Sequence, residues 1–112
     1  MESSLNSRNI AVNKNEIFIV DSHFNHIYVY SYEGDLIRHW GNLRYPKGIA
    51  IHKDIIFITD SGNHRIQAFT CGGKCVFEYV FKEEEIIKEI VLDNKYAYVS
   101  DRNNILKLEL VY

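Results

Sequence analysis

Residues 56–61 of this 112-residue chain read Ile56-Phe57-Ile58-Thr59-Asp60-Ser61, an apolar run that ends in two turn-forming residues. A strand with one face in water alternates apolar and polar residues, whereas a continuous apolar run predicts a strand covered on both faces. The pattern recurs at Ile17-Phe18-Ile19-Val20-Asp21-Ser22 and, in a shorter form, at Ala97-Tyr98-Val99-Ser100-Asp101. The sequence therefore predicts three copies of one unit, each with a strand buried on both sides.

The spacing of the copies supports a tandem repeat. Residues 10–41 align with residues 49–80 without a gap and share 10 identities in 32 positions, where chance alone gives about two. The third copy begins 41 residues after the second, at Ile90. Self-similarity at this period is typical of repeat architectures, in which each unit buries its apolar face against its neighbours.

Each copy divides into four short segments rich in β-branched and aromatic residues, with turn-forming residues between them. In the second copy the predicted strands are Gly48–Ile51, Ile55–Thr59, Arg65–Thr70 and Cys75–Val80. The charged stretch Lys82–Ile90 is expected to be a linking loop with at most one helical turn.

Four antiparallel strands in a unit that stacks face to face on identical neighbours make a β-propeller blade. The expected fold class is all-β, with about three propeller blades, the last of which lacks its outer strand. The expected organisation is an N-terminal segment, residues 1–9, followed by a propeller region, residues 10–112. Its repeats are placed at about 10–48, 49–89 and 90–112.

Two stretches of the second copy, Pro46–Ile51 and Ile56–Phe69, closely resemble the NHL repeat, whose name comes from an Asn-His-Leu signature. Asn63 and His64 stand at its first two positions. The first and third copies resemble it less, with Phe24-Asn25-His26 and Arg102-Asn103-Asn104 at the equivalent turns. The resemblance extends over residues 9–112 and implies a propeller of NHL type.

NHL propellers usually carry six blades and sometimes five, so three blades cannot close a ring. Three explanations remain open: two chains pair into a six-bladed ring, the chain extends a larger assembly, or it is a fragment of a longer protein. In a dimer, residues 2–8 could supply the missing outer strand of the partner's third blade, although they offer only Leu5 for burial. Self-association is the favoured expectation.

Composition and charge narrow the function classes. The chain is 46% apolar and 25% charged, with a formal net charge of −2, which does not draw the whole molecule to nucleic acid or to an anionic membrane. Residues 1–7 lack the layout of a signal peptide, and no apolar run is long enough to span a bilayer. We therefore expect a soluble, intracellular and most simply cytoplasmic protein with reduced cysteines.

We expect no cofactor and no metal. Cys71 and Cys75 form a single Cys-x₃-Cys pair at a predicted hairpin tip, whereas a structural zinc site commonly needs two such pairs. The five histidines show no ligand spacing. No phosphate loop, nucleophile elbow or zinc-protease motif is present, so the chain is predicted not to be an enzyme.

The aspartates that end the second strand of each copy, Asp21, Asp60 and Asp101, are interpreted as structural turn residues. Their carboxylates can accept hydrogen bonds from backbone N–H groups of the following turn. In the second copy, Arg65 is placed to pair with Asp60.

The predicted function is a non-catalytic scaffold for protein–protein interaction or assembly, because propellers present variable loops on a rigid rim. The candidate binding residues lie in the predicted rim loops and are His23, Phe24, Arg44, Tyr45, Lys47, His64, Arg65 and Arg102. Two alternatives stay open by resemblance. NHL domains of tripartite-motif ubiquitin ligases bind RNA through a basic, aromatic face, and some related six-bladed propellers are metal-dependent lyases or lactonases.

Overall fold

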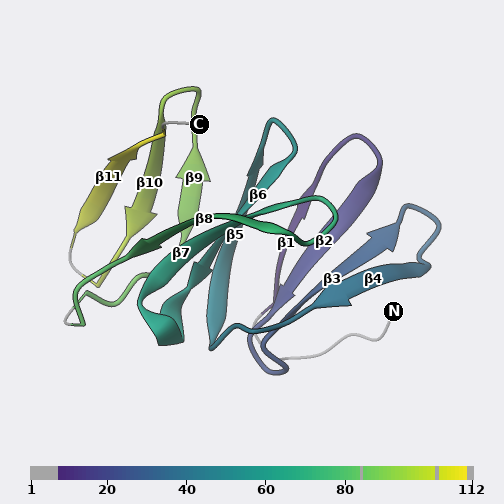
Figure 1. The fold of residues 1–112 in the computed structure, drawn as a ribbon, viewed down its shortest axis with the longest axis horizontal. Helices are drawn as coiled ribbons and strands as arrows, with labels where there is room; N and C mark the ends of the chain where they lie inside the picture. The colour runs from purple at the N-terminus through teal and green to yellow at the C-terminus, as the bar shows by residue number, and fades with distance from the viewer. Residues whose placement is uncertain (1–7, 84, 103, 111–112) are drawn as a thin grey trace.

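The computed structural model describes residues 8–83, 85–102 and 104–110, and the side chains of these residues from Asn9 onward. In this part of the chain, three antiparallel sheets lie side by side, in chain order from right to left in Figure 1. The strands of the first sheet are β1 (Arg8–Val12), β2 (Glu16–Asp21), β3 (His26–Ser31) and β4 (Leu36–Trp40). Those of the second are β5 (Pro46–His52), β6 (Ile55–Asp60), β7 (Arg65–Thr70) and β8 (Cys75–Val80). Those of the third are β9 (Ile90–Leu92), β10 (Tyr96–Ser100) and β11 (Ile105–Glu109).

Each sheet is a meander in which consecutive strands pair, and we call the three sheets blades 1, 2 and 3. The first strands of the blades, β1, β5 and β9, lie next to one another, so the sheets fan out from a common inner edge (Figure 1). Chain order, pairing and fanning together confirm the predicted all-β propeller blades. Among the described residues blade 3 has three strands, as expected.

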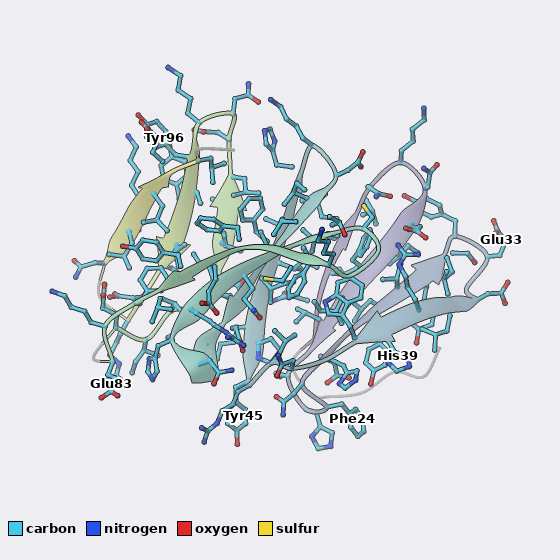
Figure 2. The ribbon with its side chains drawn as sticks, viewed as in Figure 1. Phe24, Glu33, His39, Tyr45, Glu83 and Tyr96 are labelled. Atoms are coloured by element: carbon cyan, nitrogen blue, oxygen red, sulfur yellow. The ribbon has the colours of Figure 1, made fainter. Side chains whose placement is uncertain are left out.

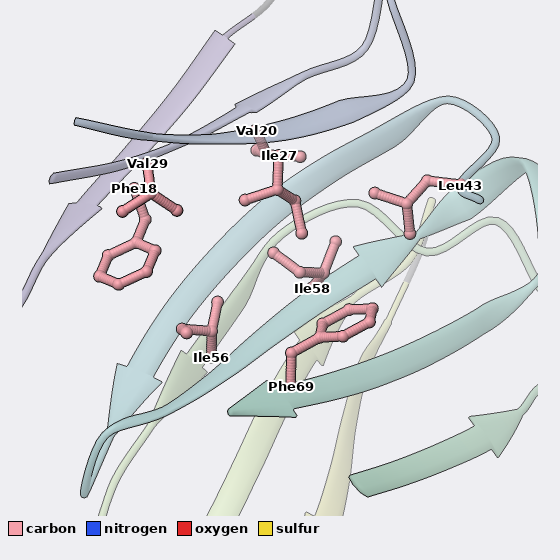
Figure 3. Packing of buried hydrophobic residues seen from close by; sticks show 8 residues of the cluster. All are labelled: Phe18, Val20, Ile27, Val29, Leu43, Ile56, Ile58 and Phe69. Carbon is pink, nitrogen blue, oxygen red and sulfur yellow. The ribbon is translucent and has the colours of Figure 1, made fainter. Parts of the chain in front are cut away.

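Each blade has two faces, which we name by the order of the blades along the chain. The preceding face is turned toward the blade before it, and the following face toward the blade after it. The following face of blade 1 packs on the preceding face of blade 2, and the two sides interdigitate closely (Figure 3). This first interface buries a cluster made of Phe18, Val20, Ile27, Val29, Leu43, Ile56, Ile58 and Phe69.

The second interface joins the following face of blade 2 to the preceding face of blade 3. Its buried cluster comprises Phe57, Ile66, Ala68, Phe81, Ile87, Ile90, Ala97 and Val99. Phe81 and Ile87 come from the linker between β8 and β9, so this linker closes one end of the interface.

Strand β6 shows why the apolar run decides the fold. Ile56 and Ile58 belong to the first interface, while Phe57 between them belongs to the second. All three side chains are buried, because successive residues of a strand point to opposite faces and a blade covers each face. The prediction that this strand is buried on both sides is confirmed.

The structure differs from the sequence expectations in detail. Strand β5 begins at Pro46, two residues before the expected start, and β6 continues to Asp60. The described residues of the linker 81–89 form no helix, in agreement with the expected loop, whereas a short 3₁₀ turn, Ser61–Asn63, stands where a simple turn is expected. His64 ends this turn in a left-handed conformation, with φ of 53°. The expected strand donation by residues 2–8 falls almost entirely outside the described residues.

No helix in the described part of the chain has the length and apolar character needed to cross a membrane.

Candidate interaction surfaces

The linker between blades 1 and 2, residues 41–45, lies against the turns of both blades at one rim. The backbone N–H of Gly62 donates to the carbonyl of Arg44 across 2.7 Å, and the N–H of Tyr45 donates to Oδ1 of Asn25 across 2.8 Å. Phe24 and Tyr45 consequently project from the same edge of the molecule (Figure 2). The structure thus brings together the predicted rim residues of blades 1 and 2.

Asp60 holds this rim together. Its carboxylate is fully buried and accepts the backbone N–H of Arg44 at Oδ1 (2.7 Å). Its Oδ2 accepts hydrogen bonds from Nε of Arg65 (2.6 Å) and Nδ2 of Asn63 (3.0 Å). The ion pair expected between Arg65 and Asp60 is present, and the carboxylate also ties blade 2 to the linker from blade 1.

Arg65 has two further contacts. Its Nη1 donates to Glu78 on β8 across 2.8 Å, and its Nη2 donates to the carbonyl of Asn42 across 3.0 Å. Burial acts to lower the pKa of this guanidinium, but the bonds with Asp60 and Glu78 outweigh it and raise the pKa above its usual value. Among the predicted binding residues, Arg65 therefore contributes to the rim's own structure.

The other two turn aspartates are engaged locally. Oδ1 of Asp21 accepts the backbone N–H groups of His23 (2.8 Å) and Phe24 (3.2 Å), and Oδ1 of Asp101 accepts that of Asn104 (2.8 Å). A carboxylate that binds successive N–H groups fixes the shape of a short turn. The turn in blade 1 therefore presents His23 and Phe24 in a defined arrangement.

The exposed side chains of the rim are mainly aromatic and basic. Phe24 and Tyr45 are 59% and 58% exposed, and the ring of His23 stands edge-on to Phe24 at 4.6 Å. Arg44 is exposed beside them, while His64 is partly buried with Nδ1 3.4 Å from the carbonyl oxygen of Glu85. Arg102 is exposed in the equivalent turn of blade 3.

Lys47 lies in a depression of about 600 Å³ at the inner edge of this rim. The depression is lined by Asn9, Ser22, Tyr45, Lys47, Ser61, Gly62, Ile86 and Glu89. Nδ2 of Asn9 donates to the carbonyl of Lys47 and to the carboxylate of Glu89, at 3.2 and 3.4 Å from its two oxygens, so one amide links blade 1 to blade 2 and to the linker that leads into blade 3. Sequence reasoning missed Asn9 and Glu89, although each stands directly before the first isoleucine of its repeat.

The cysteines are free thiols. Sγ of Cys71 donates to the carbonyl of Asp54 at 3.3 Å and packs against the first interface, and burial followed by the charges of Asp54 and Glu16 raises its pKa. A raised pKa keeps a thiol protonated and weakly nucleophilic. No cluster of three or more His, Cys, Asp or Glu side chains suited to a metal ion occurs in the described residues.

Two blade faces carry exposed apolar side chains. On the preceding face of blade 1, Ile10 is 62% exposed, and Val12 and Leu36 are also exposed. Ile49 and Ile51 hold the repeat positions of Ile10 and Val12 and pack against the first interface. The following face of blade 3 shows the same contrast in exposure. Ile105 is 74% exposed, whereas Ile66, which has the same place in the register of blade 2, is 1% exposed.

Comparisons with known proteins agree with this architecture. The family model of the NHL repeat matches residues 43–69. Curated proteins gave no significant match. Among solved structures, virginiamycin B lyase from Staphylococcus aureus superposes with a TM-score of 0.75 at 16% identity, over 94% of this chain and 41% of that one.

Two further structures are similar. BamB from Moraxella catarrhalis has a TM-score of 0.74 at 9% identity, over 88% of this chain and 30% of that one. Glutaminyl cyclase from Myxococcus xanthus has a TM-score of 0.69 at 13% identity, over 90% of this chain and 47% of that one. The chain thus spans less than half the length of each of these three structures.

The prediction that the chain is not an enzyme is contradicted by these comparisons. It rested on missing sequence motifs and on the fold, yet the fold is shared with a lyase and a cyclase. Missing motifs do not decide the matter, because one fold hosts many functions and each depends on its own site residues. At these low identities, the structural likeness establishes the fold alone. The family match identifies residues 43–69 as an NHL repeat, and the structural likeness shows that the chain has the fold of part of a β-propeller.

Proposed function

We propose that this chain is a protein-interaction module that associates with a second copy of itself, so that two sets of three blades form one six-bladed ring. The observation that carries the proposal is the exposure of apolar side chains whose repeat equivalents are covered, fully or in part, by a neighbouring blade. Ile10 and Val12 are exposed, while Ile49 and Ile51 contact a neighbouring blade. Exposed apolar patches of this kind mark interaction sites.

The preceding face of blade 1 is apolar and aromatic across its width. Residues paired across its strands share this face, among them Ile10, Ile19, Tyr28 and His39. The rings of His26, Tyr28 and His39 lie 5.4–5.9 Å apart and extend the face to its outer edge. Such a surface suits another blade better than solvent.

The following face of blade 3 supplies the complementary surface. It carries Val91, Tyr98 and Ile105, and Nζ of Lys107 lies 4.0 Å from the centre of the Tyr96 ring. In a two-fold dimer this face meets the preceding face of blade 1 of the other chain, and the same contact forms twice. Each contact repeats the stacking that already joins blades within one chain.

The rim offers a surface for other protein partners. Phe24, Tyr45 and Arg44 are exposed at this rim, and their backbone N–H groups are held by Asp21, Asn25 and Asp60 respectively. Tyr and Arg on a rigid support are typical anchors of protein interfaces. We assign partner recognition to this rim, with Lys47, His23, His64 and Arg102 at its margins.

The self-association proposal is tested with a double variant, Ile10→Glu with Val12→Glu, and light scattering after size-exclusion chromatography at micromolar concentration. Two carboxylates on the preceding face of blade 1 should leave the chain monomeric, because an unpaired charge cannot be buried between blades. The matched control is Phe24→Glu, which places a charge at a rim residue of similar exposure and should leave the wild-type mass unchanged. Equal masses for the double variant and an associating wild type would overturn the proposal.

A further inference from the structure

We propose that the open edge of β11 accepts a β-strand from another polypeptide, an extended segment with apolar residues at alternate positions, which completes blade 3. This inference rests on the proposed interaction function and names a site and a class of ligand for it. Three features carry it: the backbone groups of the edge, the repeat position that the strand fills, and an apolar pocket beside it.

Within the part of the chain that the structure describes, β11 is an edge strand whose outer backbone groups pair with no other strand. The N–H of Leu110 donates to the carbonyl of Lys95, and the N–H of Asp101 donates to that of Asn104, which fixes the hydrogen-bonding phase of the β10–β11 ladder. In an antiparallel pair, alternate residues direct their N–H and C=O groups toward the partner strand. Those of Leu106 and Leu108 therefore face β10, and those of Ile105, Lys107 and Glu109 point to the open edge.

In the other two blades, the equivalent edge is paired with a fourth strand. In blades 1 and 2 the third strand pairs with β4 and β8 respectively. Ser100 pairs with Ile105 in blade 3, just as Thr59 pairs with Ile66 in blade 2. Strand β11 therefore has the place of β7, with residue numbers that are higher by 39. Among the described residues, no strand pairs with β11 at the place that β8 occupies beside β7.

An apolar pocket of about 260 Å³ adjoins this edge. It is lined by Ile55, Phe57, Ala68, Val76, Phe77, Glu109 and Leu110, and it continues the second interface toward solvent. At the equivalent place in the first interface, Arg38 binds both carboxylate oxygens of Glu16 and the carbonyl of Cys71. Ile55 and Phe77 hold the repeat positions of Glu16 and Arg38, so no such ion pair fills this pocket.

The surroundings specify the chemistry of the incoming strand. Residues opposite Leu106 and Leu108 would face blade 2 and cover Phe77 and Tyr79, so they should be apolar. A residue opposite Lys107 should be acidic and one opposite Glu109 basic, because opposite charges stabilise cross-strand pairs. For an antiparallel strand these rules give the probe peptide Ser-Lys-Val-Glu-Val-Thr-Ser.

The test is hydrogen exchange followed residue by residue by NMR, with this peptide at millimolar concentration. Binding should slow exchange at the amides of Ile105, Lys107 and Glu109 at least about tenfold, and should leave Leu106 and Leu108 nearly unchanged because they already face β10. A control peptide with proline in place of its glutamate lacks the N–H that meets Lys107 and should give no protection. Unchanged exchange at all three edge amides would overturn the proposal.

A pair of variants on β8 tests the pocket. Phe77→Ser removes a lining side chain and should weaken peptide binding about tenfold, whereas Val80→Ser changes an exposed residue on the opposite face of the strand and should not weaken it. Equal weakening by both variants would count against the site.

The same measurement on the double variant Ile10→Glu with Val12→Glu separates this proposal from the dimer. Protection of the edge in a monomeric chain supports strand addition even if self-association fails. If the wild-type chain associates but the peptide does not protect the edge amides of β11, the dimer proposal is supported and the strand-addition proposal is wrong.

Discussion

Arg65 donates through Nε to Oδ2 of Asp60 across 2.6 Å, while the other oxygen of that carboxylate holds the backbone N–H of Arg44. The buried side chain of Asp60, the last residue of β6, thereby binds both the first residue of β7 and the linker that comes from blade 1. The blades are thus connected by a polar contact at the rim as well as by the apolar clusters between them.

The carboxylate of Asp60 is predicted to be a large local contributor to stability. Asp60→Ala leaves the N–H of Arg44 and the guanidinium of Arg65 without their partner, and should lower the free energy of unfolding by about 3 kcal/mol. Asp101→Ala, in the equivalent and less buried turn of blade 3, should lower it by about 1 kcal/mol. Urea denaturation of the two variants measures the difference, and equal losses would show that Asp60 is an ordinary turn residue.

Gly62 is predicted to be required by a close approach of the backbone. A Cβ at this position would lie 2.6 Å from both Cγ and the carbonyl oxygen of Arg44, so Gly62→Ala must displace the linker. The expected cost is about 1–3 kcal/mol. Gly72→Ala is the matched control, because its Cβ would meet nothing nearer than Oγ1 of Thr70 at 3.9 Å, and its effect should stay within about 0.5 kcal/mol. A thermal melt that ranks the two glycines the other way would contradict the rim geometry.

The ion pair between Glu16 and Arg38 makes part of the stability dependent on pH. The hydrogen bond from Arg38 is the main reason that the pKa of Glu16 lies below its ordinary value of 4.5. A depressed pKa means that the pair stabilises the folded chain above pH 4.5, and that this contribution disappears as the pH falls through the folded-state pKa.

The pH dependence can be measured against Glu16→Gln. The wild-type chain should be more stable than this variant at pH 7, and the gap should close as the pH falls below 4.5. Glu33→Gln, at an exposed hairpin tip (Figure 2), should show no comparable gap. A gap for Glu16→Gln that stays constant down to pH 3 would argue against the ion pair.

The strands and their stacking could be predicted because the sequence encodes them locally. The run Ile17–Val20 has no polar residue to turn toward water, which predicts a strand covered on both faces, and the structure covers both faces of its copy β6. Repetition of the run at Ile56–Thr59 then implies that neighbouring copies cover each other. Asp-Ser pairs and glycines mark the intervening turns.

The inner depression and the edge pocket could not be predicted in the same way. Asn9 meets Glu89 across 80 residues of sequence, a contact set by the rotation between blades and by no local pattern. The pocket beside β11 depends on Ile55 and Phe77 standing where blade 1 has Glu16 and Arg38. Such differences acquire meaning only when the interfaces are compared in three dimensions. The prediction that the chain is not an enzyme is wrong for a similar reason, since sequence motifs report only residues that are near in sequence.

The mass of the unmodified chain in solution tests the central claim most directly. If the uncovered faces of blades 1 and 3 serve to pack against further blades, sedimentation equilibrium at increasing micromolar concentration should approach twice the 13.2 kDa of one chain. A mass that remains at 13.2 kDa across that range would show that these faces are stable in water, and would contradict ring completion by a second copy.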